Sequence, residues 1–424
     1  MADGPISSAR PPGPRPKGEL LSDYWSDVLG SRAGDGPRPM RILHYIIGLR
    51  NEFGGPVRAT IDLSNVLAAR GHDVTVMTHD DKDAPAAWKQ GLPGVPKVRL
   101  IPRPTLPGGF YAPEALAAIE PIIRAHDILH LHGVWERPNL QFSRQAADFD
   151  VPYVVSLRGM LDDWCMHQGR AKKRLYLAVS GRRMLEEAGW VHCTAVGELE
   201  QSKKWFPKGR GAVIPNLLDL GPFREMPGTD LAMEKLGLDP NGPPIILFLS
   251  RLHEKKGPGV LLRAAAILKA AGKNFRLLLA GAGDAPYVKA LNDLTASLGL
   301  SDCVRFLGLV SGATKLSLYR AAHVMALPTS QENFGFVFYE ALASGTPIVT
   351  TYGADTWPEL RASGGALIVH QKPEDVAQAC SALLDDPTKR DLMGRLGRQW
   401  MFDCFEPMVL IQKFEGLYQT ASIR

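Results

Sequence analysis

Two glutamates, Glu332 and Glu340, lie eight positions apart around a glycine in the second half of the chain. The apolar run His323–Leu327 predicts a buried strand, and Gly335 is expected to open a helix that ends before Pro347. A helix N-terminus that follows a strand exposes backbone N–H groups and a positive dipole end, which together suit a phosphate. The same pattern also fits an ordinary strand-to-helix crossover with two solvated glutamates.

Two cations, Arg251 and Lys256, follow the apolar run Pro244–Leu249 and precede an expected helix at Gly259–Ala271. An arginine binds phosphate oxygens in pairs, and a lysine acts as a point charge, so the two form a reasonable diphosphate clamp. The alternative is solvated surface charge. The clamp is favoured because both cations precede a helix whose N-terminus points the same way.

Three further polar features fall at predicted strand ends in the first half of the chain: the Gly54-Gly55 loop, His132 and Arg158. Glycines let the backbone approach a ligand closely at a helix N-terminus. His132 follows an apolar strand, where a histidine either packs in the core or meets a ligand. Ligands of open parallel sheets bind beyond the carboxyl ends of the strands.

Two series of alternating strands and helices are expected to position these residues. The first series has strands at Arg41–Ile47, Asp73–Met77, Val98–Ile101, Asp127–Leu131, Tyr153–Leu157, Val191–Ala195 and Ala212–Ile214. The second has strands at Pro244–Leu249, Phe275–Ala280, Val304–Leu307, His323–Leu327, Ile348–Thr351 and Ala366–Val369. The alternation predicts an α/β protein with two doubly wound, Rossmann-like domains that face each other across a cleft.

The chain has 424 residues, which is too long for one compact core. We expect a flexible tail at residues 1–39, domains at 40–222 and 223–404, and a linker in the loop-rich segment Asp219–Asp230. The five cysteines are scattered without metal-ligand spacing, and no apolar run is long enough to span a membrane. These features favour a cytoplasmic protein with reduced thiols.

The quoted residues together resemble one enzyme family. The matching motifs are Gly54-Gly55-Pro56, His130-Leu-His-Gly-Val-Trp135, Ser156-Leu-Arg-Gly-Met160, Ser250-Arg-Leu-His-Glu-Lys-Lys-Gly257 and Glu332-x7-Glu340. In combination they resemble the retaining glycosyltransferases of the GT-B fold, and within them the group 1 / family 4 class that uses nucleotide-sugar donors. The resemblance covers about residues 40–422. The motif Ile214-Pro-Asn-Leu-Leu-Asp219 departs from it, because relatives often carry a glycine after the asparagine.

The resemblance implies a role for each donor-side residue. Arg251 and Lys256 would hold the donor diphosphate and neutralise the leaving group, Glu332 would face the sugar hydroxyls, and Glu340 would bind the ribose. The backbone that receives sugar or phosphate oxygens would come from Phe334, Gly335, Phe336 and Val337. The base would lie near the turn that contains Val310.

The resemblance also assigns the first domain to the acceptor and the second to the donor. Gly54 and Gly55 would let a loop approach the diphosphate, His132 would lie at the reacting sugar, and Arg158 would lie on the acceptor side. The last helix, within residues 407–422, would cross back onto the first domain. Retention would proceed by attack on the same face as the leaving group, with the departing phosphate taking the acceptor's proton, so Glu332 orients the sugar and is no nucleophile.

No cofactor and no metal are expected. Asp81-Lys-Asp83 has the D-x-D shape of metal sites in another glycosyltransferase fold, but it lies in a polar loop and is interpreted as solvated. Two other functions remain open: a nucleotide-sugar 2-epimerase, which needs an acid/base pair that the residues around Glu332 do not show, and a non-catalytic nucleotide-sugar binder, which would not need Arg251, Lys256, Glu332 and Glu340 together.

The basic stretch at residues 170–210 is the best clue to the acceptor. It holds ten Lys/Arg and four Glu, a local charge of +6 against +5 for the whole chain, with aromatic residues between the cations. It suits an anionic membrane surface at the inner face of the cell membrane, and so an enzyme that acts on a sugar or a lipid-linked sugar in polysaccharide or glycolipid synthesis. A solvated face and contacts to an acceptor phosphate are alternatives. No nucleic-acid motif accompanies the charge, so no nucleic-acid partner is expected.

Overall fold

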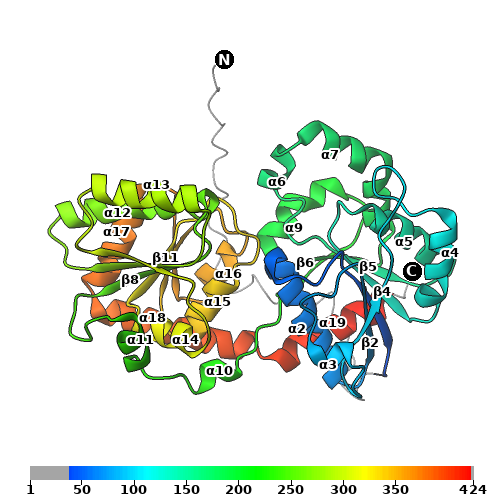
Figure 1. Ribbon diagram of the computed structural model, residues 1–424, viewed down its shortest axis with the longest axis horizontal. Helices are drawn as coiled ribbons and strands as arrows, with labels where there is room; N and C mark the ends of the chain where they lie inside the picture. Colours follow the sequence, from blue (N-terminus) through cyan, green and yellow to red (C-terminus); the bar gives the residue numbers. More distant parts are fainter. Residues whose placement is uncertain (1–37, 422–424) are drawn as a thin grey trace.

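The computed structural model describes residues 38–421 as two α/β lobes that lie side by side (Figure 1). Nearly all of the predicted tail at residues 1–39 therefore lies outside the described residues. Each lobe has one sheet in which all paired strands run parallel. Among the described residues, no helix combines the length and the apolar character that crossing a membrane requires.

The N-terminal lobe has a seven-stranded sheet in the order β3-β2-β1-β4-β5-β6-β7. Its strands are β1 (Arg41–Tyr45), β2 (Asp73–Thr78), β3 (Lys97–Leu100), β4 (Ile128–His132), β5 (Tyr153–Ser156), β6 (Trp190–Cys193) and β7 (Gly211–Val213). Its helices are η1 (Asn51–Phe53), α2 (Gly55–Ala69), α3 (Ala86–Lys89), α4 (Pro113–Arg124), α5 (Arg137–Asp148), α6 (Asp163–His167), α7 (Arg170–Tyr176), the π-helical η2 (Leu177–Gly181), α8 (Arg182–Glu187), α9 (Val196–Ser202) and η3 (Lys203–Trp205). The reversal of strand order between β1 and β4 opens a crevice at the strand ends.

The C-terminal lobe has a six-stranded sheet in the order β10-β9-β8-β11-β12-β13. Its strands are β8 (Ile245–Leu249), β9 (Arg276–Ala280), β10 (Val304–Gly308), β11 (Val324–Leu327), β12 (Ile348–Thr351) and β13 (Ala366–Val369). Its helices are α10 (Gly221–Arg224), α11 (Asp230–Leu236), η4 (Glu254–Lys256), α12 (Pro258–Ala270), α13 (Ala285–Ser297), α14 (Gly312–Ala321), α15 (Phe336–Ala343), α16 (Trp357–Ala362), α17 (Pro373–Leu384) and α18 (Pro387–Cys404). The reversal between β8 and β11 again lies at the crevice.

The segment predicted as a loop-rich linker, Asp219–Asp230, is mostly loop and contains the short helix α10. Pro222 at its first turn suits a helix start, and Phe223 is buried, so the segment packs as part of the protein. The last helix, α19 (Pro407–Ala421), packs against α2 and β5 of the N-terminal lobe, as Figure 1 shows. Arg70, which caps the C-terminus of α2, forms an ion pair with Glu415 of α19 at 3.0 Å that holds the returning helix on this lobe.

Candidate functional site

A cavity of about 470 Å³ lies between the two lobes. Ten of the thirteen predicted site residues line it: Gly54, Gly55, Arg158, Arg251, Lys256, Glu332, Phe334, Gly335, Phe336 and Val337. The other three, His132, Val310 and Glu340, do not. The cavity is therefore the candidate site, with one wall from each lobe.

The C-terminal wall carries its cations after β8. Lys256 is buried and forms an ion pair with Glu332, whose backbone is held by the loop at Gly353. Gly257 has a φ of 73°, and a Cβ there would lie 2.1 Å from the carbonyl oxygen of Pro328, so only glycine lets η4 turn into α12 beside β11. Arg251 is exposed and has no carboxylate partner within 4 Å among residues 38–421.

Gly335 shapes the anion-binding part of this wall. Its φ of 69° and ψ of 68° lie in the left-handed region, and a Cβ there would lie 2.6 Å from the ring of Phe338. The glycine opens α15, whose first N–H groups have no partner within the helix. The N-terminus of α15 therefore presents donors and a partial positive charge to the same cavity as Lys256 and Arg251.

Glu340 lies within α15, away from the cavity wall, and only 2% of it is exposed. Lys315 donates to both of its carboxylate oxygens at 3.0 and 3.1 Å, Tyr319 donates at 3.0 Å, and Arg58 of the N-terminal lobe donates at 2.9 Å. Both oxygens are thus engaged in this conformation. A ribose would have to share Glu340 with these donors.

The N-terminal wall is formed by the Gly54-Gly55 loop and by Arg158. Gly54 has a φ of 72°, and a Cβ on Gly55 would lie 3.9 Å from the ring of Phe336 across the cavity. Arg158 also has a positive φ, 58°, which is uncommon for a residue with a side chain. Its Nη1 donates to Asn216 Oδ1 at 2.5 Å.

The charge of Arg158 has no bonded counter-ion: among residues 38–421, no carboxylate lies within 4 Å of its guanidinium. Burial lowers its pKa to about 10, although the charge of Glu198 opposes this shift. Glu198 does not bond the side chain, because its oxygens accept from the backbone N–H groups of Gly159 and Thr194. Arg158 is therefore a cation at the cavity wall that can bind an anionic ligand.

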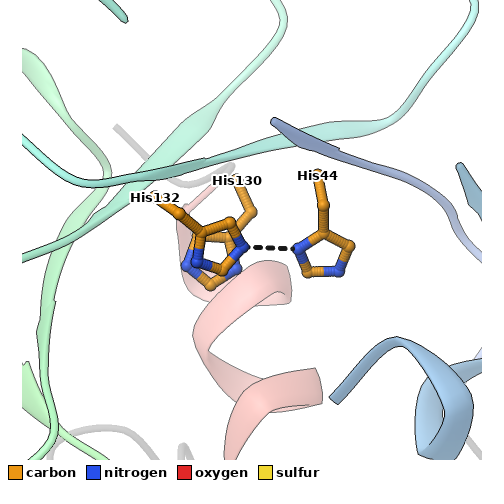
Figure 2. A group of neighbouring side chains, drawn as sticks. All are labelled: His44, His130 and His132. Atoms are coloured by element: carbon orange, nitrogen blue, oxygen red, sulfur yellow. Dashed lines mark hydrogen bonds between the residues drawn. The ribbon is translucent and has the colours of Figure 1, made fainter. Parts of the chain in front are cut away.

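His132 lies behind Arg158 and is buried. Nη2 of Arg158 donates to its Nδ1 at 3.0 Å, and since a guanidinium can only donate, the proton of this imidazole is on Nε2. That N–H donates to Nδ1 of His44 at 3.1 Å, the dashed line in Figure 2. Burial holds the pKa of His132 well below its usual range and lowers that of His44 to about 3, so both are neutral acceptors.

A second hydrogen-bonded chain runs beside the first. His192 donates to the carbonyl of Ile214 and so accepts from Ser156 at 2.6 Å. Ser156 in turn accepts from His130, whose Nδ1 accepts from Tyr418 of α19 at 2.8 Å. His130 stacks on His132, with ring centroids 4.3 Å apart (Figure 2). These two chains form a histidine ladder (His44, His130, His132 and His192) under the N-terminal wall.

The ladder bears on metal binding, because ligand nitrogens of His44, His130 and His132 lie within 4.8 Å of one another. The nitrogens of His130 already meet Tyr418 and Ser156, and those of His132 meet Arg158 and His44. A metal would have to displace several of these hydrogen bonds. The arrangement suits a neutral hydrogen-bonded support better than a metal site.

Two other predicted features lie outside the cavity. Val310 is half-buried and packs against the core of the C-terminal lobe. Asp83, interpreted from the sequence as solvated, is partly exposed and accepts a hydrogen bond from the backbone N–H of Asn51 at 2.8 Å. The carboxylate stabilises the loop before α2 because it caps an otherwise unpaired donor.

A second cavity, about 630 Å³ in volume, lies in the N-terminal lobe at the carboxyl ends of its strands. Phe53 lines both cavities, so the two adjoin. The wall includes His79, Arg103, Trp135, Glu136 and Arg137. Burial raises the pKa of Glu136 to about 6, and Arg137 lies over the rings of Phe110 and Tyr176.

Comparisons with known proteins agree with this architecture. The family model described as glycosyl transferases group 1 matches residues 232–400, and the glycosyl transferase 4-like domain matches residues 54–217. The chain belongs to the group 1 / family 4 glycosyltransferases. The D-inositol 3-phosphate glycosyltransferase of Kineococcus radiotolerans is 28% identical to this glycosyltransferase over 375 residues, which are 81% of this chain and 85% of the relative.

Solved structures share the fold of this glycosyltransferase. Anabaena HepE, solved in complex with UDP-glucose, superposes with a TM-score of 0.67 at 20% identity, covering 88% of this chain and 97% of HepE. Sucrose-phosphate synthase from Thermosynechococcus elongatus superposes with a TM-score of 0.69 at 22% identity, covering 89% and 98%. The family and the GT-B fold predicted from the sequence motifs are therefore confirmed.

Three contributors to the site of this glycosyltransferase were not predicted. Asn216 lines the cavity and orients Arg158, while Arg58 and Lys315 hold Glu340. The Pro215-Asn216 motif after β7 could have indicated Asn216. In the sequence, however, the motif was interpreted only for the glycine that is missing after the asparagine. Arg58 and Lys315 look like ordinary helix-surface cations in the sequence, and only the fold brings them to Glu340.

Proposed function

We propose that this glycosyltransferase moves a sugar from a nucleotide-diphosphate sugar to a sugar or lipid-linked sugar acceptor, with retention of the anomeric configuration. The observation that carries the proposal is the cavity between the lobes, where Arg251, Lys256 and the N-terminus of α15 face Arg158 and the Gly54-Gly55 loop. Breaking a glycosyl–phosphate bond leaves negative charge on the diphosphate. Fixed cations and N–H groups around that charge stabilise the transition state.

Each wall residue has a role in this proposal. Arg251 and Lys256 neutralise the leaving diphosphate, and Glu332 orients the sugar through the carboxylate that now meets Lys256. Arg158 adds charge from the opposite wall, and Glu340, which lies behind the cavity wall, meets the ribose by sharing its oxygens with the donors that now hold it. The complex of Anabaena HepE with UDP-glucose supports a nucleotide-sugar donor in this fold.

Within this proposal, the carboxylates that line the cavity, Glu332 and Asp162, bear on the route by which retention would proceed. Lys256 holds Glu332, while Gln331 and the backbone N–H of Cys165 hold Asp162. Neither suits a nucleophile, so a departing phosphate that accepts the acceptor's proton explains the chemistry better than a double displacement. The cations that neutralise this phosphate belong to the protein, and we propose a reaction that needs no metal ion.

We place the acceptor in the adjoining cavity of the N-terminal lobe, since Phe53 lies at the boundary of both spaces. The aromatic rings and polar side chains there suit the faces and hydroxyls of a sugar. We also propose that the enzyme works in the cytoplasm, where its five free thiols stay reduced, at an anionic membrane surface and in polysaccharide or glycolipid synthesis.

The test is a thermal-shift screen with UDP-, GDP- and ADP-glucose, followed by NMR of the product formed from the donor that binds. We expect one donor to raise the melting temperature and to give an α-linked product from an α-linked donor, with and without EDTA.

Lys256→Ala and Glu332→Ala should each lower kcat by about two to three orders of magnitude, whereas Lys269→Ala on the outer face of α12 should not. An inverted product, a 2-epimerised nucleotide sugar, or donor binding without turnover would each contradict the proposal.

A further inference from the structure

One helical segment of the N-terminal lobe carries cations without acidic neighbours in sequence. Residues 170–183, called the basic helix below, run through α7, η2 and the start of α8 and contain six Lys/Arg and no Asp or Glu. In Figure 1 this segment forms the outer end of its lobe, away from α19. A run of like charge on one helix needs either solvent or an anionic partner.

The outer face of the basic helix is apolar at its centre. Leu175 is 65% exposed and Val179 is 71% exposed, while the adjacent Tyr176 and Leu177 are buried in the lobe. Leu175 and Val179 lie four positions apart and therefore share one face. Lys172 precedes them and Arg182 follows them, and both are exposed. Exposed aliphatic side chains flanked by cations are typical of helices that lie in a membrane interface.

Most of these cations are not neutralised by the protein. Arg183 pairs with Glu187 at 2.7 Å, and Lys173 donates to the carbonyl of Cys165. Among residues 38–421, no carboxylate lies within 4 Å of the charged groups of Arg170, Lys172, Arg174 and Arg182. Because a second copy of this face would bring the same charges together, an isologous dimer through it is disfavoured.

A small cavity of about 220 Å³ opens beside the basic helix. Its lining residues are Asp163, Met166, His167, Arg170, Arg174, Lys204 and Trp205. Lys204 pairs with Asp163, so the two arginines keep their charge free for a ligand. Two arginines and an indole ring in a space of this size suit one phosphate group and the glycerol next to it.

We propose that the basic helix docks this enzyme onto an anionic lipid bilayer, with Leu175 and Val179 in the interface and a lipid phosphate at Arg170 and Arg174. The short helix α6 connects this surface to the reaction, because Trp164 and Cys165 line the cleft cavity while Met166 and His167 line the small one. Docking would therefore bring a lipid-linked acceptor to the edge of the cleft. The inference rests on the membrane placement proposed above and not on the chemistry of transfer.

The test is cosedimentation with vesicles, using the full chain without donor or acceptor. We expect binding to phosphatidylglycerol/phosphatidylcholine vesicles, none to phosphatidylcholine alone, and weakening as salt rises. Lys172→Gln, Arg174→Gln and Arg182→Gln combined should weaken the partition constant about a hundredfold, since each cation near such a surface contributes roughly a factor of five. Leu175→Ser with Val179→Ser should weaken it about tenfold.

The C-terminal lobe offers matched controls. Lys235→Gln, Lys289→Gln and Arg395→Gln remove the same charge from exposed positions, and Leu392→Ser with Leu396→Ser alters another exposed pair four positions apart. Neither control should change binding. No binding by the unaltered chain, equal loss in the charge controls, or self-association that the Leu175/Val179 variant abolishes would overturn the proposal. Glycosyl transfer to a soluble acceptor would be unaffected by that failure, so the two proposals are tested separately.

Discussion

The two walls of the cleft hold their charges in different ways. On the C-terminal wall, Lys256 pairs with Glu332, and behind it Lys315 pairs with Glu340, so each buried charge has a counter-ion in its own lobe. On the N-terminal wall, Arg158 is held by Asn216 and His132, which are both neutral. Apart from the exposed Arg251, the charges discussed on the C-terminal wall are paired in the absence of a ligand, whereas Arg158 on the N-terminal wall has no counter-ion in the part of the chain that the structure describes.

The difference shows on which wall an anionic ligand gains the most binding free energy. A diphosphate that binds Lys256 must replace or share the Glu332 carboxylate, whereas an anion that approaches Arg158 meets a half-buried charge that has no counter-ion among the described residues. A partly desolvated cation without a counter-ion strengthens the binding of an anion. Neutral acceptors such as the Nδ1 of His132 fix the direction of the guanidinium without cancelling its charge.

The largest expected effect comes from removing this charge. Arg158→Met keeps most of the side-chain volume, and we expect it to lower kcat/KM for the donor by about two to three orders of magnitude, as the loss of a preorganised group that stabilises transition-state charge usually does. The same change should lower the free energy of unfolding, because the buried acceptors on Asn216 and His132 lose their donor. Steady-state kinetics and urea unfolding measure the two effects.

Arg158→Lys provides the control. A lysine keeps the charge but cannot reach Asn216 and His132 together, so we expect an intermediate loss of about tenfold in kcat/KM. If Arg158→Met were as active as the unaltered enzyme, the contrast between the two walls would carry no functional meaning.

The C-terminal wall was the more predictable one. Its residues lie in short motifs after β8 and β11, and the backbone geometry that they need follows from Gly257 and Gly335. The N-terminal wall depends on contacts between distant strands: His44, His132 and Arg158 come from β1, β4 and the loop after β5. Sequence placed His132 at the right strand end but could not show that Arg158 occupies the space between it and the cavity.

The strands were also more predictable than the helices. Buried parallel strands are continuous apolar runs, and the bounds of β12 and β13 agree with their predictions at Ile348–Thr351 and Ala366–Val369. Helices α5, α9 and α16 were missed, because they are polar or short and receive their order from packing against other elements.

A smaller effect is expected from the histidine ladder. Burial lowers the pKa of His44 from 6.5 to about 3, so protonation favours the unfolded chain, and the stability that this histidine contributes above pH 6.5 is lost as the pH falls through that range. His44→Asn keeps an acceptor for the Nε2–H of His132 and removes the titratable imidazole of His44. It also removes the Nε2 atom of His44, which has no hydrogen-bond partner among the described residues. The stability advantage of the unaltered protein over this variant should shrink by about 1.4 kcal/mol per pH unit below 6.5.

Comparing the unaltered protein with the His44→Asn variant at each pH cancels the contributions of the titratable groups that both proteins share. Glu359 at the contact between the lobes is one such group: burial raises its pKa to about 7, which has the opposite sign and favours the folded protein in acid. Urea unfolding at pH 8.5, 7.5 and 5.5 measures the difference. The difference in the free energy of unfolding between the two proteins should be the same at pH 8.5 and 7.5, which is the internal control. If that difference also stays the same at pH 5.5, His44 is not a buried neutral acceptor.

The smallest expected effect concerns Arg58, a cation of the N-terminal lobe that bonds a carboxylate of the C-terminal lobe. Arg58 of α2 reaches Glu340 at 2.9 Å and lies 4.3 Å from the centre of the Phe336 ring, which lines the cavity. Its side chain is 40% exposed, and Glu340 keeps Lys315 and Tyr319 when Arg58 is lost. Arg58→Ala should therefore cost only about 1 kcal/mol, seen as a rise in donor KM of about fivefold with kcat unchanged.

Arg70→Ala is the matched control, because Arg70 caps the same helix and forms an ion pair with Glu415 that stays within the N-terminal lobe and its returning helix. It should lower stability without raising the donor KM. The sign of the Arg58 effect decides its meaning. A higher KM shows that Arg58 helps to hold the walls together around the donor. A lower KM shows that Arg58 competes with the ribose for the carboxylate of Glu340.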